Sequence, residues 1–129
     1  MKNLSKMFKP ESVAVIGASN TPGKVGYIIV DNLINDGFEG KIYPVNPKGG
    51  EILGKQAYAS IKDIPEKVDL AIITIPSVFV NETVKDCGEV GVENMVVITA
   101  GFKEVGEEGA KLEAELTALG EKYGININQ

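Results

Sequence analysis

Residues 12–26 read SVAVIGASNTPGKVG, and this stretch decides the fold class. It opens on a short β-branched run, 12–16, which Gly17 ends in the manner of a strand. From Gly23 onward apolar residues recur at helical spacing as far as Gly37, a plausible helix stop. A strand, a glycine-containing turn and an amphipathic helix in this order indicate the first unit of an α/β protein.

The rest of the chain repeats the alternation of strand and helix. Residues 68–75 (VDLAIITI) are nearly continuously apolar, which predicts a central strand buried on both faces of a parallel sheet. Ser77 is placed to cap the helix that follows. We further expect an arm or short helix at 2–10, strands at 41–45, 95–99 and from 125, and a helix at 107–123. The prediction is an α/β, Rossmann-like parallel sheet of about five strands with helices on both faces.

Composition excludes several classes of function. The 129 residues carry a net charge of −5, and all 13 basic residues are lysines, which argues against a nucleic-acid surface. The chain has no histidine, so the usual general base, nucleophile partner and metal ligand are missing. We expect no catalytic and no metal site. The single cysteine, Cys87, falls in an amphipathic helical stretch, where a buried and inert thiol is the common case.

No apolar run approaches the roughly 18 residues of a membrane span, and residues 1–10 lack the apolar centre of a signal peptide. We therefore expect a cytoplasmic protein without a membrane partner.

The loops that follow the strands carry the candidate site, because ligands of open parallel sheets bind at the carboxyl ends of the strands. The first, which we name the glycine loop, spans residues 17–26. Its glycines let the backbone approach a diphosphate at a helix start, and Ser19 and Lys24 could add contacts. The loop matches neither the dinucleotide GxGxxG nor the Walker pattern. Glycines that merely permit a tight turn are the alternative.

The second loop opens with Asn46-Pro47-Lys48, where a nicotinamide-binding domain normally has an acidic residue for the ribose hydroxyls. A lysine at this place suits an additional phosphate, such as the one on the adenosine ribose of coenzyme A. An ordinary surface lysine is the alternative. After the third strand comes a kinked exit, Ile75-Pro76, and after the fourth comes Ala100-Gly101-Phe102.

Four segments together resemble one known family. They are residues 12–26 (SVAVIGASNTPGKVG), 40–54 (GKIYPVNPKGGEILG), 68–77 (VDLAIITIPS) and 97–109 (VITAGFKEVGEEG). They are similar to the N-terminal CoA-binding domain of ADP-forming acyl-CoA synthetases such as acetate-CoA ligase, relatives of the succinyl-CoA synthetase alpha subunit.

The resemblance implies coenzyme A as the ligand and assigns residues to its parts. Along the phosphates it implies Gly17, Ala18, Ser19, Gly23, Lys24 and Gly26. It implies Val45 and Lys48 near the adenosine, and Ile75, Pro76 and Ala100 along the pantetheine arm. Val25 and Asn46, which lie within the same motifs, complete the predicted set.

The resemblance also implies that residues 1–129 are one CoA-binding domain, the N-terminal fragment of a longer synthetase. Such enzymes interconvert acyl-CoA, ADP and phosphate with acid, CoA and ATP, through a phosphohistidine in other domains. The expected partners are CoA or acyl-CoA and the remaining domains or subunits. Two alternatives stay open: a stand-alone CoA-sensing domain and an NAD-binding Rossmann regulatory domain.

Overall fold

The computed structural model describes residues 9–98 and 106–128. A parallel five-stranded sheet forms the centre, in the order β2-β1-β5-β6-β7. Its strands are β1 (Ser12–Ile16), β2 (Lys41–Val45), β5 (Leu70–Ile73), β6 (Asn94–Val97) and β7 (Asn126–Asn128). The predicted central strand is confirmed, because β5 lies in the middle of this order.

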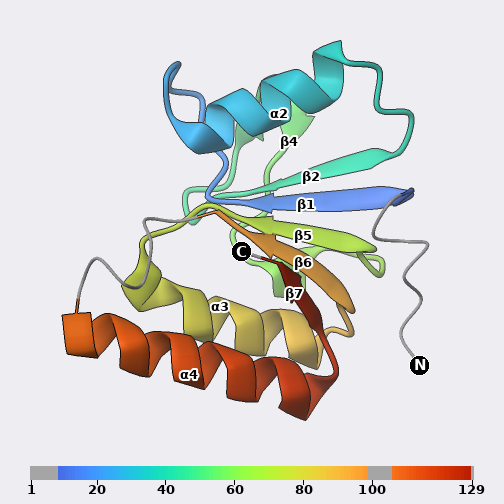
Figure 1. Cartoon of the computed structure of the whole chain (residues 1–129). Helices are drawn as coiled ribbons and strands as arrows, with labels where there is room; N and C mark the ends of the chain where they lie inside the picture. Colours follow the sequence, from blue (N-terminus) through green and yellow to red (C-terminus); the bar gives the residue numbers. More distant parts are fainter. Residues whose placement is uncertain (1–8, 99–105, 129) are drawn as a thin grey trace.

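In the described part of the chain, three helices cover the two faces of the sheet. Helix α2 (Val25–Asn35) lies on one face, and α3 (Ser77–Glu89) and α4 (Gly106–Tyr123) lie side by side on the other (Figure 1). Alternation along β1 matches this arrangement, since Val13 and Val15 pack in the cluster with α2 whereas Ala14 and Ile16 pack in the cluster with α3 and α4. The predicted α/β, Rossmann-like class is confirmed.

The strands end in register at one edge of the sheet. Ile16 of β1 pairs with Val45 of β2 and with Ile73 of β5, and Ile73 pairs with Val97 of β6. The residues directly after these four strands therefore lie side by side. Connections diverge to opposite faces between β1 and β5, the topological switch point at which such sheets bind ligands.

Several element boundaries differ from the predictions. The loop after β2 contains a short hairpin, β3 (Glu51–Ile52) and β4 (Lys55–Gln56), and a 3-10 turn at Ile61–Asp63. Strand β5 is shorter than the predicted 68–75, and β6 begins and ends earlier than predicted. The helix predicted at 107–123 forms with a start at Gly106. Most of the predicted arm at 2–10 lies outside the described residues.

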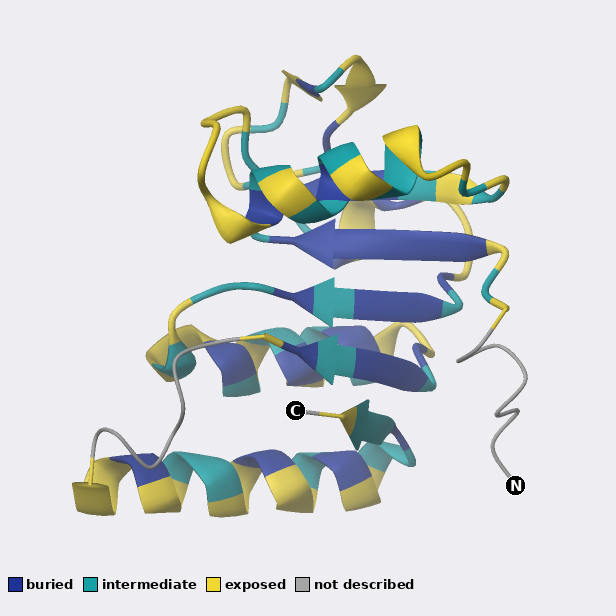
Figure 2. Ribbon diagram, turned by 45° about the horizontal axis from the view of Figure 1, so that its top comes forward, coloured by how far each residue is buried: buried dark blue, intermediate teal, exposed yellow. Residues whose placement is uncertain are grey.

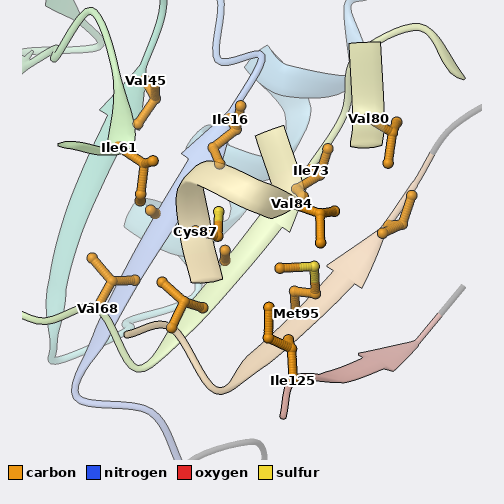
Figure 3. Close-up of a cluster of buried hydrophobic side chains, with 14 of the residues drawn as sticks. Ile16, Val45, Ile61, Val68, Ile73, Val80, Val84, Cys87, Met95 and Ile125 are labelled. Atoms are coloured by element: carbon orange, nitrogen blue, oxygen red, sulfur yellow. The ribbon is translucent and has the colours of Figure 1, made fainter. Parts of the chain in front are cut away.

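Burial follows the layers. The sheet strands are mostly buried, while each helix has a buried stripe toward the sheet and an exposed outer face (Figure 2). The larger core lies between the sheet and the pair α3 and α4, and it includes Ile73, Met95 and Cys87 (Figure 3). No helix in the described part of the chain is long and apolar enough to cross a bilayer.

Cys87 is a core residue of α3 with no exposed surface, as predicted. Burial, with a smaller contribution from Asp86, raises the pKa of its thiol from 9.0 to about 12. The thiolate, which is the reactive form, is therefore suppressed at neutral pH.

This pKa shift predicts a loss of stability in alkali. Between pH 9 and pH 12 the folded thiol keeps a proton that the unfolded thiol has lost, so the free energy of unfolding falls as the pH rises. Urea titrations at pH 8, 9 and 10 should show a fall steeper in the wild type than in Cys87→Ala, by up to about 1 kcal/mol per pH unit. Val84→Ala, a buried truncation on the same helix, should keep the wild-type slope. Equal slopes in all three proteins would contradict the prediction.

Candidate functional site

A cavity of about 660 Å³, here the first cavity, lies where the carboxyl ends of β1 and β5 meet the starts of α2 and α3. It takes in the residue directly after each of four sheet strands: Gly17, Asn46, Thr74 and Ile98. Its full lining is Gly17, Ala18, Ser19, Lys24, Val25, Gly26, Asn46, Thr74, Ile75, Pro76, Ser77 and Ile98. The cavity occupies the place that parallel-sheet topology reserves for a ligand.

Two glycines of the loop are required by close packing. Gly17 has a φ of 96°, and a Cβ there would lie 2.8 Å from the Thr74 carbonyl oxygen. A Cβ on Gly26 would overlap the Gly17 carbonyl oxygen and come within 2.9 Å of the Ala18 Cα. The first turn of α2 can therefore rest directly on the start of the loop. Gly23 differs, because its φ of 93° favours glycine but no atom lies within 4 Å of an added Cβ.

Not all backbone N–H groups around the first cavity are free to donate to a ligand. The N–H groups of Gly17 and Ala18 both donate to the Val45 carbonyl oxygen, at 3.1 and 3.2 Å. Gly17 and Ala18 thus shape the loop and tie it to β2. The amides of Val25 and Gly26 are in the first turn of α2, where N–H groups have no partner within the helix. Those amides are the donors suited to a phosphate.

Both helices that start at the first cavity lack a side-chain cap. The N-cap positions are Lys24 for α2 and Pro76 for α3, neither side chain caps its helix, and neither first turn carries an acidic residue. The prediction that Ser77 caps α3 was wrong. Ser77 is the first helical residue, because Pro76, with its fixed φ, takes the cap position. Two positive helix ends therefore border the cavity, and none of its described lining residues is a carboxylate that would neutralise them.

A second cavity of about 440 Å³ adjoins the first and shares Gly17, Ile75 and Pro76 with it. Its other walls are mainly apolar, with a few polar side chains: Ile16, Val45, Pro47, Ala59, Ser60, Ile61, Phe79, Glu82, Thr83 and Asp86. Lys62 forms ion pairs with Asp86 and Glu89 at 3.3 and 2.8 Å, which link the 3-10 turn to α3 beside this cavity.

The structure brings most of the predicted site residues together. Nine of them line the first cavity: Gly17, Ala18, Ser19, Lys24, Val25, Gly26, Asn46, Ile75 and Pro76. Val45 lines the second cavity, whereas Gly23 and Lys48 line neither. Lys48 is exposed, and it follows Pro47 of the second cavity. Ala100 lies outside the described residues.

Sequence reasoning missed some of the lining. One missed residue is Thr74, whose hydroxyl donates a hydrogen bond to the Ile16 carbonyl oxygen at the end of β1, at 3.0 Å. A polar residue at the end of an apolar strand was the available signal. Ser60 and Ile61 reach the second cavity because Tyr58 bridges to Val45 beside β2. No sequence pattern indicates that pairing.

Comparison with known proteins identifies the family of the chain. The sequence profile of a CoA binding domain matches residues 11–129. The chain belongs to the CoA binding domain family. Over 97% of its length it is 50% identical to the alpha subunit of acetate-CoA ligase (ADP-forming) I from Pyrococcus furiosus. It is 53% identical to acetate-CoA ligase (ADP-forming) I from Archaeoglobus fulgidus over 96% of its length.

A solved structure contains a domain with the same fold as this CoA binding domain. The acetyl-coenzyme A synthetase 1 of Ca. Korarchaeum cryptofilum, in complex with phosphate and ADP, superposes with a TM-score of 0.91 and 46% identity over 98% of the chain. The chain covers 28% of the Pyrococcus relative, 18% of the Archaeoglobus relative and 27% of this synthetase. The resemblance to ADP-forming acyl-CoA synthetases is confirmed, and the chain corresponds to under a third of each.

Proposed function

We propose that the chain binds coenzyme A in the two adjoining cavities. The observation that carries the proposal is the first cavity, where two uncapped helix starts and Lys24 meet and no described lining residue is acidic. Such a site suits a diphosphate. The first cavity adjoins the second, largely apolar cavity. This arrangement suits a ligand that has a charged centre and less polar ends.

The parts of CoA can be assigned along this path. The diphosphate lies at the first turn of α2 beside Lys24. The adenosine enters the second cavity next to Val45, with its ribose phosphate toward Lys48. The pantetheine arm passes Ile75 and Pro76.

We further propose that this is the CoA-binding part of a longer ADP-forming acyl-CoA synthetase, acetyl-CoA being the acyl-CoA that the relatives suggest. The overall reaction converts acyl-CoA, ADP and phosphate into acid, CoA and ATP. This chain has no histidine, so a phosphohistidine must come from the remaining domains or subunits. Its own role is to bind and orient CoA or acyl-CoA.

The binding proposal is tested by calorimetry on this chain with CoA, acetyl-CoA and NAD. We expect both CoA ligands to bind and NAD not to bind. Asn46 stands where an acidic residue holds the ribose hydroxyls of NAD, and both polar atoms of its side chain already have partners within the protein. Binding of NAD without binding of CoA would overturn the proposal in favour of a nicotinamide-dependent or redox-sensing domain.

Two lysine variants test the phosphate contacts. Lys24→Ala and Lys48→Ala should each weaken CoA about tenfold or more, because a charge-assisted hydrogen bond contributes roughly 1.5 to 3 kcal/mol. For dephospho-CoA, Lys48→Ala should matter much less while Lys24→Ala keeps its effect. Lys111→Ala, an exposed lysine of α4, serves as the charge control. Equal losses for both ligands in both variants would refute the assignment.

A further inference from the structure

The side chain of Asn46 joins the two phosphate-binding segments of the site. Its Nδ2 donates to the Ala18 carbonyl oxygen of the glycine loop at 2.9 Å. Its Oδ1 accepts from the Lys48 N–H at 2.8 Å. One partner is a carbonyl and the other an N–H, so the pair requires a side chain that both donates and accepts. An aspartate would set a carboxylate oxygen against the Ala18 carbonyl.

Asn20 makes a second connection of the same kind. From the glycine loop its Nδ2 donates to the Glu51 carbonyl oxygen at 2.7 Å, and its Oδ1 accepts from the Leu53 N–H at 3.1 Å. Leu53 is one of the two turn residues of the β3–β4 hairpin and has a φ of 49°, a conformation that leucine rarely adopts. The side chain of Asn20 therefore stabilises a strained turn that lies more than 30 residues away in the sequence.

Three of these four hydrogen bonds join segment 46–53 to the glycine loop, near both ends of the segment, and the fourth, from the Lys48 N–H, lies within the segment. Lys48 lies between the two attachment points, in a turn that the Gly49 N–H closes by donating to the Asn46 carbonyl oxygen at 2.8 Å. Gly49 and Gly50 both have positive φ, so this turn has little side-chain support of its own. Backbone hydrogen bonds to Ala57 and Tyr58 hold the turn to the neighbouring segment, whereas the two asparagines connect it to the glycine loop.

We propose that Asn46 and Asn20 are positioning residues that hold the Lys48 turn at a fixed distance from the glycine loop. The inference rests on the proposed CoA binding, in which these two segments hold different phosphates of one ligand. Pre-organising both segments before CoA arrives lowers the ordering cost of binding. The asparagines act through Lys48 and the loop, without needing to contact CoA themselves.

Amide hydrogen exchange tests the hydrogen bonds of both asparagine side chains without any ligand. Asn46→Ala should speed exchange at the Lys48 N–H, and Asn20→Ala should speed it at the Leu53 N–H, because each amide loses its acceptor. Asn35→Ala is the matched control, since Asn35 hydrogen-bonds Asp31 within α2. It should leave both sites unchanged. Unchanged exchange at Lys48 in Asn46→Ala would overturn the proposal, and so would unchanged exchange at Leu53 in Asn20→Ala.

Calorimetry on a double-mutant cycle then tests positioning. Asn46→Ala should weaken CoA about tenfold, from the loss of two hydrogen bonds. In the Asn46→Ala background, Lys48→Ala should weaken CoA binding by a further factor of less than about three, because a displaced lysine contributes little. In the wild type the same substitution should weaken binding about tenfold. Losses that multiply would show independent residues and overturn the proposal. If the wild type bound no CoA, the proposed function would fail, while exchange would still decide whether the asparagines hold segment 46–53.

Discussion

Gly26→Ala should abolish tight CoA binding and destabilise the fold. The new Cβ would overlap the carbonyl oxygen of Gly17 and press on the Ala18 Cα, and both neighbours are backbone that cannot rotate away. Helix α2 must therefore move off the glycine loop. Overpacking of this kind costs about 3 kcal/mol in the free energy of unfolding. If CoA binding must restore the original geometry, the binding free energy is reduced by a similar amount, which corresponds to an affinity about 100-fold lower.

Calorimetry and urea denaturation measure these two losses, and two glycine variants serve as controls. Gly88→Ala meets the Tyr123 ring between α3 and α4, so it should lower stability yet leave the CoA affinity of the folded protein unchanged. Gly23→Ala has open space and should cost only about 1 to 2 kcal/mol of backbone strain. Wild-type CoA affinity in Gly26→Ala would show that the close contact of loop and helix is unimportant for the site.

Ile73→Ala should give the largest loss of stability without touching a polar group of the site. Ile73 is fully buried on the central strand β5, among side chains from both neighbouring strands and from α3 (Figure 3). Truncation of a buried isoleucine to alanine costs about 2 to 5 kcal/mol, because a cavity remains. Urea denaturation provides the measurement. Ile28→Ala removes the same atoms from a side chain that is 45% exposed and should change stability by about 0.5 kcal/mol or less. A similar small change at Ile73 would contradict the assigned core.

The main elements of this fold were predictable because their signals are local. The apolar run at 68–75 is explained by burial on both faces of the sheet, and the spacing of apolar residues after Gly23 is explained by the stripe of α2 that faces β1. The hairpin β3–β4 was missed for the opposite reason. Each of its strands has two residues, and its turn places Leu53, a leucine, where glycine or asparagine is usual. The stabilising contact comes from Asn20, which local patterns cannot connect to it.

In the candidate site, too, some features were predictable from local sequence and others were not. The sequence by itself determined that a glycine-containing loop joins the first strand to the first helix, and that a lysine, with no acidic residue, follows the second strand. These are properties of neighbouring residues. Only the tertiary structure decided which N–H groups face the cavity, because the Val45 carbonyl accepts from Gly17 and Ala18 and leaves the α2 amides for a ligand. Only the tertiary structure joined Asn46 to Ala18 and Asn20 to Leu53, since parallel pairing of β1 with β2 brings together loops that lie about 30 residues apart in the chain.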